Sequence, residues 1–263
     1  MALCVTEPGT GSDVSALSTS ARRLNGEYLL NGSKCFITNG GVADYYIVFA
    51  TVDRSLGHRG ITAFVVPREA DGVSVGKKED KMGQRAADTT DVIFDEVVVP
   101  AADRIGEEGE GFRIIMQTFN QSRPGVAASA VGLARSALDQ ALDYALEREQ
   151  FGVPIFMHQS IMFMLADMAR DIAAGRLLAW QAAWKGEQGL DNSTEAAMAK
   201  VFCGDMVMRV TTDAVQVYGG YGYVKDYPVE KLMRDAKVFQ IYEGTAQVQR
   251  LLIGRALARE KKR

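Results

Sequence analysis

The segment PAADRIGEEGEG, residues 100 to 111, divides the chain into two parts of different composition. Before it, short apolar stretches alternate with Gly, Asp and Pro, a pattern typical of β-strands separated by turns. After it, the composition shifts to Ala, Leu, Met and Glu, and apolar residues recur at helical spacing. This division predicts an α+β fold. An antiparallel β-sandwich or barrel-like domain is expected at residues 1–105, followed by an up-down helical bundle of the four-helix type at residues 106–263.

Four stretches of the first part predict β-strands. In YLLNGSKCFITNG (28–40), two short runs flank Asn31-Gly32, and an Asn-Gly pair between such runs predicts a β-hairpin turn. Three further stretches are rich in β-branched and aromatic residues and predict single strands: YYIVFATV (45–52), GITAFVVP (60–67) and DVIFDEVVVP (91–100).

The second part predicts three long helices and two shorter ones. Pro124 lies inside the first of them, where it either kinks the helix or is accommodated locally. The helices are expected at residues 110–147, 158–189, 193–218, 229–238 and 245–259.

Composition argues against several classes of protein. The chain has 263 residues with 30 basic and 33 acidic side chains, and its formal net charge of −3 argues against a general nucleic-acid-binding protein. The densest apolar stretch, Tyr45–Val52, is too short to span a membrane, and no secretory signal stands at the start. The three cysteines and two histidines share no ligand spacing, so no metal site is expected. We therefore expect an intracellular soluble protein.

A single carboxylate, Glu243, is the strongest candidate for catalysis. In RDAKVFQIYEGTAQVQ (234–249) it follows the apolar run Val238–Tyr242 and precedes Gly244 and Thr245, which can open a helix. A carboxylate on an apolar surface is desolvated, as suits a general base that removes a carbon-bound proton. A helix-capping or surface Glu is the alternative, and the segment alone does not decide between the two.

A Gly-rich polar loop stands near the other end of the chain. Leu3–Asp13, LCVTEPGTGSD, reads as a short strand and a loop whose N–H groups and hydroxyls suit an anion or the polar edge of a ring. The loop lacks the third glycine of a dinucleotide-binding fingerprint, so a nicotinamide-binding Rossmann site is not expected. An ordinary hairpin turn is the alternative.

These two segments together resemble the acyl-CoA dehydrogenase family, and further similar motifs follow in the family's order along almost the whole chain. The residues around SRP and GTAQVQR are most similar to medium-chain members. The further motifs are FITNGG (36–41), KMGQRAADT (81–89), SRPGVAASAVGLA (122–134), EREQFGVPIFMHQ (147–159), QVYGGYGY (216–223) and YPVEKLMRDAK (227–237).

The resemblance implies an FAD-dependent enzyme that converts a saturated acyl-CoA into the trans-2-enoyl-CoA and passes electrons to an electron-transferring flavoprotein. Glu243 resembles the family's catalytic base. The thioester oxygen would lie between the backbone N–H of Glu243 and a flavin ribityl hydroxyl, and the β-hydrogen would leave as hydride to the flavin. The residues expected to contact substrate are Ser12, Asn120, Arg123, Tyr242 and Gly244.

The resemblance also implies where FAD is bound. Thr6 would meet the pyrimidine edge of the isoalloxazine, Thr38 would lie by its reactive nitrogen, and Phe36 stands where many members have Trp. Arg148 belongs to a segment that would reach the FAD of a neighbouring subunit, which implies a homo-oligomer, a tetramer or a dimer. The expected cofactor-binding residues are Leu3, Val5, Thr6, Gly11, Ser12, Phe36, Ile37, Thr38, Arg148, Phe151, His158, Gln159, Gln216, Gly219, Gly220, Gly244, Thr245 and Gln247.

Family members normally carry a helical domain before the β domain, so the resemblance covers the middle and C-terminal domains only. A fragment, an alternative start and a divergent member with a partner are all open. Two alternatives to a dehydrogenase are also open: an acyl-CoA oxidase on the same fold and a truncated, non-catalytic assembly subunit. The expected location is the cytoplasm of a bacterium or the mitochondrial matrix of a eukaryote.

Overall fold

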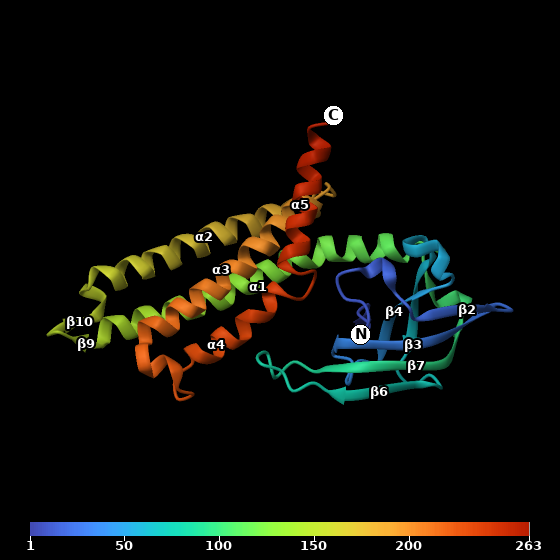
Figure 1. The fold of residues 1–263 in the computed structure, drawn as a ribbon, viewed down its shortest axis with the longest axis horizontal. Coiled ribbons are helices and arrows are strands. Elements are labelled where there is room, and N and C mark those ends of the chain that lie inside the picture. Colours follow the sequence, from blue (N-terminus) through green and yellow to red (C-terminus); the bar gives the residue numbers. More distant parts are fainter. Residues whose placement is uncertain (263) are drawn as a thin grey trace. The chain divides into compact units, whose positions relative to one another are not determined.

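The computed structural model describes residues 1–262 and comprises two compact units, Met1–Gln117 and the residues from Thr118 onwards (Figure 1). The limit between them falls inside the long helix α1 (Gly111–Glu147). Each unit has its own buried apolar core.

The first unit is built on one sheet of eight strands. Their order is β6-β7-β3-β2-β4-β5-β8, and β1 pairs with β4 outside this path. Short 3-10 helices lie at Val14–Ala16, Arg54–Gly60 and Ala101–Asp103. The strands are β1 (Ala2–Cys4), β2 (Ser20–Leu24), β3 (Glu27–Thr38), β4 (Tyr45–Thr51), β5 (Ile61–Pro67), β6 (Val73–Lys78), β7 (Thr89–Pro100) and β8 (Arg104–Ile105).

This sheet curls around its own core. Tyr28 on β3 packs edge-on against Phe64 on β5 with ring centroids 4.9 Å apart, although β2 and β4 separate those strands in the sheet. Tyr46 on β4 meets Phe94 on β7 at 6.3 Å in the same way. The predicted barrel-like β domain is therefore confirmed. One detail differs, because β1 and β2 both pair with β4 in parallel, not antiparallel.

The hairpin predicted at Asn31-Gly32 is wrong. Strand β3 continues through these residues, and its register against β7 shifts there, as in a β-bulge. The hairpin turn is Asn25-Gly26, which joins β2 to β3, and Gly26 has the φ of +79° that such a turn requires. The same dipeptide thus makes a turn at one position and a bulge at the other. The strands predicted at residues 45–52, 60–67 and 91–100 are confirmed as β4, β5 and β7.

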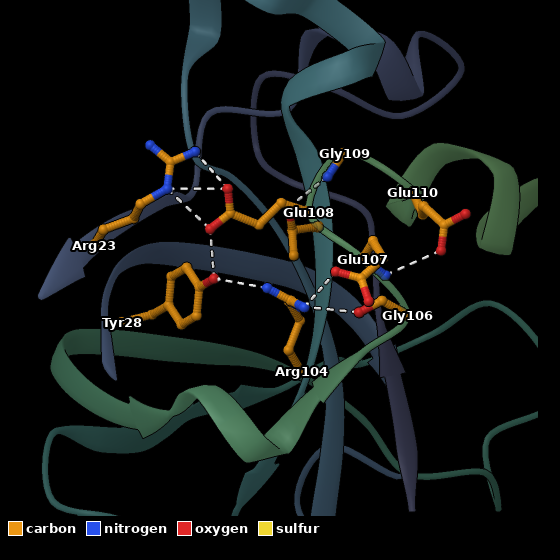
Figure 2. A network of polar contacts seen from close by, with 9 residues as sticks. Arg23, Tyr28, Arg104, Gly106, Glu107, Glu108, Gly109 and Glu110 are labelled. Carbon is orange, nitrogen blue, oxygen red and sulfur yellow. Dashed lines mark hydrogen bonds and ion pairs between the residues drawn. The ribbon is translucent and has the colours of Figure 1, made fainter. Parts of the chain in front are cut away.

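A polar network fastens the segment that follows β8 to the sheet (Figure 2). The Glu108 carboxylate accepts hydrogen bonds from the Nε of Arg23 on β2, at 2.9 Å, and from the hydroxyl of Tyr28 on β3. Arg104 donates to that hydroxyl at 3.1 Å and to the carbonyl of Gly106 at 2.8 Å. The hydrogen bond from Arg23 lowers the pKa of Glu108 to about 2. The segment that divides the two compositions is therefore an ordered part of the β unit.

The second unit is a bundle of helices, and each helix begins and ends within two residues of its predicted limits. A two-stranded hairpin of β9 (Glu149–Gln150) and β10 (Val153–Pro154) separates α1 from the next helix. Small residues at helical spacing let α1 approach its neighbours closely. Those on α1 are Ala127, Ala130, Ala134, Ala137, Ala141 and Ala145. The other helices are α2 (Gln159–Glu187), α3 (Ser193–Tyr218), α4 (Val229–Ala236) and α5 (Ala246–Glu260).

Pro124 is accommodated inside α1, one of the two predicted outcomes. Proline lacks the N–H that would pair with the carbonyl of Asn120 one turn earlier. That carbonyl instead accepts a hydrogen bond of 3.1 Å from the side-chain amide of Asn192, which lies just before α3. The same amide also donates to the carbonyl of Ala182 on α2 at 3.1 Å. One buried side chain therefore satisfies the acceptor that proline leaves free.

None of the helices formed by residues 1–262 combines the length and the apolar character that crossing a bilayer demands. The described residues also contain no group of three or more His, Cys, Asp or Glu side chains placed to hold a metal ion. Cys4, Cys35 and Cys203 are buried free thiols, and burial raises the pKa of Cys4 and of Cys203 to about 12.

Two glycine substitutions test this fold. Gly26→Ala should lower the free energy of unfolding by about 1–2 kcal/mol, because alanine is strained at the positive φ of the β2–β3 turn. Gly132→Ala is the control, since Gly132 lies in α1 with open space around its Cβ position. That change should raise the free energy of unfolding by about 0.5–1 kcal/mol. Urea unfolding of both variants measures the two effects, and a stabilising Gly26→Ala would contradict the turn.

Candidate functional site

Glu243 lies on the loop between the 3-10 helix η6 (Lys237–Gln240) and α5, with a left-handed φ of 56° that is uncommon outside glycine. The half-buried side chain turns toward α1, where its Oε2 accepts a hydrogen bond of 2.6 Å from the hydroxyl of Ser122. The next helix begins after Thr245, whose hydroxyl accepts from the N–H of Val248 at 3.3 Å. The carboxylate is therefore held against the bundle.

Three buried side chains hold the backbone of this loop from below. Arg123 Nε donates to the carbonyl of Glu243 at 3.1 Å, and Lys200 Nζ donates to the carbonyl of Gly244 at 2.6 Å. The amide of Gln249 donates to both carbonyls, at 3.2 and 3.0 Å. Arg123, Lys200 and Gln249 are only 3%, 1% and 0% exposed. Donors from α1, α3 and α5 thus converge on two oxygen atoms.

The backbone N–H groups of the loop differ from its carbonyls. Within the part of the chain that the structure describes, the N–H groups of Glu243 and Gly244 donate no hydrogen bond to the protein. The peptide between the two residues is trans, so the N–H of Gly244 points away from the buried donors that hold the carbonyl of Glu243. Fixed N–H donors of this kind suit an oxygen on which negative charge develops.

Two of the buried donors carry positive charge. Among residues 1–262, no carboxylate oxygen lies within 4.0 Å of the charged nitrogens of Arg123 or Lys200, so neither forms a direct ion pair. The Glu243 carboxylate nevertheless attracts both of them at longer range. Burial, followed by the nearby Arg123, lowers the pKa of Lys200 to about 8. Burial also lowers the pKa of Arg123, and Glu243 opposes that effect. The loop therefore sits over a buried positive charge.

Arg123, one of the residues expected to contact substrate, lies beside Glu243 and donates a hydrogen bond to its carbonyl. Its contact with substrate stays a prediction, as do those of Ser12, Asn120, Tyr242 and Gly244. Lys200, Gln249 and the hydrogen bond from Ser122 were not foreseen. A signal for Lys200 was present, because it stands one turn from Ala196 and Cys203, both on the buried face of α3.

In the β unit, the two segments expected to bind flavin lie side by side. The N–H of Cys35, at the end of β3, donates to the carbonyl of Thr6 at 2.9 Å. A buried ion pair lies beneath them, with Lys34 Nζ 2.8 Å from Glu7 Oε1 and 3.1 Å from the carbonyl of Val5. Although burial acts to raise it, Lys34 lowers the pKa of Glu7 to about 2. This pair joins the loop after β1 to β3.

These two segments bring one aromatic side chain and two hydroxyl side chains to the surface of the β unit. Phe36 is 65% exposed, and its backbone has a φ of 56°, which is uncommon for a residue other than glycine. The side chain of Thr38 is exposed beside it, and Thr6 is half-buried. Val5 and Ile37 are buried, so only their backbone can meet a ligand. The remaining predicted residues of this group are Leu3, which is half-buried, and Gly11 and Ser12, which are exposed.

In the helical unit, a cavity of about 740 Å³ lies between the β9–β10 hairpin and the end of α3. Five predicted residues line it: Arg148, Phe151, His158, Gly219 and Gly220. Gln159 and Gln216 lie on the adjoining helix ends outside its lining.

The cavity combines a cation with exposed aromatic rings. The guanidinium of Arg148 lies 5.6 Å from the ring centre of Tyr221. Phe151 is 94% exposed, and its ring centre lies 5.7 Å from that of His158. Such a set suits a diphosphate attached to a planar base. Thr245 and Gln247 instead line a smaller cavity of about 450 Å³, together with Asp205, Lys237 and Arg250.

Two family models match almost the whole chain. The acyl-CoA dehydrogenase middle domain matches residues 2–97, and the acyl-CoA dehydrogenase C-terminal domain matches residues 109–258. The chain belongs to the acyl-CoA dehydrogenase family. Its homologues there are FAD-dependent oxidoreductases. The prediction that the resemblance covers the middle and C-terminal domains is confirmed.

Individual acyl-CoA dehydrogenases are similar over the same region. An acyl-CoA dehydrogenase of Bacillus subtilis (strain 168) is 53% identical over 256 residues, which are 97% of this chain and 68% of that protein. The solved butyryl-CoA dehydrogenase of Megasphaera elsdenii has a TM-score of 0.96 at 50% identity, covering 98% of this chain and 67% of its own. A chain in a structure of the electron-transferring flavoprotein of Acidaminococcus fermentans has a TM-score of 0.96 at 51% identity, covering 97% and 67%. This chain spans about two thirds of each.

The buried pair between Lys34 and Glu7 gives a prediction on stability. Glu7→Gln should lower the free energy of unfolding by about 3–5 kcal/mol, because it leaves a buried ammonium without its counter-charge. Arg85→Gln is the control, since it breaks only the exposed pair with Asp80 and should cost at most about 1 kcal/mol. Urea unfolding at pH 7 compares the two variants, and equal losses would contradict the role of burial.

The same pair predicts acid sensitivity. The pKa of Glu7 is about 2 in the folded protein and 4.5 as its ordinary value, so the folded state holds the charged form more strongly. The stabilisation is fully present above pH 4.5 and is lost as the pH falls from 4.5 toward 2. Across this range the free energy of unfolding should fall more steeply with decreasing pH in the natural chain than in Glu7→Gln. Parallel curves would show that Glu7 does not contribute.

Proposed function

We propose that this chain carries the flavin-binding and catalytic residues of an acyl-CoA dehydrogenase, with Glu243 as the base. The main support is the arrangement of one loop. The Glu243 carboxylate accepts a hydrogen bond from Ser122, and buried donors hold the carbonyls of Glu243 and Gly244. An assembly subunit without catalysis would have no physical need for two buried cations beneath a carboxylate.

In this proposal the Glu243 carboxylate removes the proton from the carbon next to the thioester carbonyl. As that proton leaves, negative charge grows on the thioester oxygen, and the unpaired backbone N–H of Glu243 can donate to it. One preorganised donor of this kind contributes about 3–4 kcal/mol to stabilising the transition state. The Ser122 hydroxyl keeps the carboxylate oriented before the proton is taken.

The residues present fit FAD. When bound, FAD would supply the redox chemistry by accepting the β-hydrogen as hydride. In the β unit, Phe36 would pack against the ring system, and Thr6 and Thr38 would offer polar groups to its edges. In the helical unit, Arg148 would donate to the diphosphate, and Phe151 would stack with the adenine. The resemblance implies that this second group belongs to a neighbouring copy's FAD, so we propose a homo-oligomer.

Two relatives support a proposal for the substrate and the electron acceptor. A relative at 50% identity is named a butyryl-CoA dehydrogenase, which favours a short acyl chain over the medium chain suggested by the motifs. Another, at 51% identity, comes from a structure of an electron-transferring flavoprotein. We propose short-chain acyl-CoA as substrate and an electron-transferring flavoprotein as acceptor.

Anaerobic flavin reduction tests this function. The purified chain should bind FAD and turn yellow, and butyryl-CoA should bleach the flavin absorbance faster than octanoyl-CoA. Glu243→Gln should still bind FAD, yet its flavin should be reduced about 10²–10⁴-fold more slowly, because the base is lost. Glu187→Gln, an exposed change at the end of α2, is the control and should behave like the natural chain.

The outcomes separate the alternatives. A chain that binds no FAD, or a Glu243→Gln variant that bleaches at the natural rate, would overturn the proposal. Rapid consumption of oxygen during turnover without an added acceptor would identify an acyl-CoA oxidase instead.

FAD affinity tests the cavity at Arg148. Arg148→Gln should weaken FAD binding by about 10- to 100-fold, the loss expected for one charge-assisted hydrogen bond to a phosphate. Arg135→Gln is the matched control, because Arg135 pairs with Asp139 on the exposed side of α1. Quenching of FAD fluorescence on binding gives both affinities. Equal affinity for FAD in the two variants would show that Arg148 does not bind the cofactor.

A further inference from the structure

We infer that Lys200 is a positioning residue for Glu243: its buried ammonium holds the loop through the Gly244 carbonyl and adds, with Arg123, positive charge beneath the Glu243 carboxylate. This inference deepens the proposed function and rests on it for its catalytic meaning. The placement of Lys200 under the loop stands on the geometry alone.

The position of Lys200 is not that of an ordinary lysine. It is the eighth residue of α3, it is 1% exposed, and its ammonium reaches the Gly244 carbonyl at 2.6 Å. Lysine is almost never fully buried without a charged partner, because taking the ammonium out of water is costly. No carboxylate lies within 4.0 Å of it among residues 1–262.

The hydrogen bond alone does not account for a lysine here. Gln249 already donates to the carbonyls of both Glu243 and Gly244, so a neutral donor serves the same oxygens. What Lys200 adds is charge. A buried charge interacts more strongly with a neighbouring ion than an exposed one does, since little water screens it.

Charged groups act on Lys200 from α1, from the Glu243 loop and from α3 itself. Arg123 on α1 repels it, and Glu243 on the loop attracts it. Asp205, five residues further along α3, also attracts it, but this carboxylate already accepts hydrogen bonds from Arg250 of α5 and from the Gln240 amide. Glu243 is thus the carboxylate on which both buried cations act.

Titration of the Glu243 carboxyl group tests the inference without FAD or substrate. Carbon-13 NMR of the glutamate-labelled chain follows the side-chain carboxyl, which Glu243→Gln assigns. In Lys200→Met the midpoint of this titration should rise by about one pH unit, the size of shift expected when one nearby opposite charge is removed. The matched variant Gln249→Met removes a neutral donor to the same carbonyls and should leave the midpoint in place.

Each outcome decides the question. A raised midpoint in Lys200→Met alone supports the role of charge. An unchanged midpoint, or equal shifts in both variants, overturns it. If the natural chain neither binds FAD nor is bleached by acyl-CoA, the proposed function fails, while this titration still reports on Lys200.

A second measurement avoids the risk that Lys200→Met fails to fold. Because the pKa of Lys200 is about 8, loss of its proton in the natural chain should cause a second inflection of the Glu243 carboxyl signal near pH 8. Lys200→Arg keeps a charge that does not titrate there and should abolish this inflection. An inflection that persists in Lys200→Arg, or its absence from the natural chain, overturns the inference.

Discussion

The helical unit depends on the convergence of three buried donors on two carbonyl oxygens. Arg123, Lys200 and Gln249 come from three different helices, and each donates a hydrogen bond to a carbonyl of the Glu243 loop. A buried donor without an acceptor costs about 1–3 kcal/mol, and more when it is charged. The packing of the helices and the left-handed turn at Glu243 therefore stabilise each other, because neither satisfies its polar groups alone.

The β unit uses a buried charge for a similar purpose. Lys34 on β3 and Glu7 on the loop after β1 form an ion pair that water hardly reaches. Glu7 also accepts hydrogen bonds from the N–H groups of Ser18 and Thr19, at 2.7 and 2.9 Å. One carboxylate thus joins three segments and shapes the surface that carries Phe36 and Thr38. In both units, the groups offered to a ligand are held by polar groups beneath them.

Local patterns predicted most of the fold. The five α-helices begin and end within two residues of their predicted limits, because apolar residues recur along them at helical spacing. The hairpin at Asn31-Gly32 was wrong because the chemistry of an Asn-Gly pair is the same at Asn25-Gly26. Only the pairing of β3 with β7 makes the second pair a bulge. The separation of the predicted cofactor residues into a β-unit surface and a helical cavity likewise depends on contacts between distant segments.

The sequence by itself determined the α+β class, the order of the helices, the family and the identity of Glu243 as the candidate base, because these follow from periodicity and from motifs of adjacent residues. Only the tertiary structure decided how the base is held. Lys200 lies 43 positions before Glu243 and Ser122 lies 121 before it, so no local pattern joins them. The physical reason is that hydrogen-bond partners across such separations are chosen by helix packing, which brings side chains together only once the core has formed.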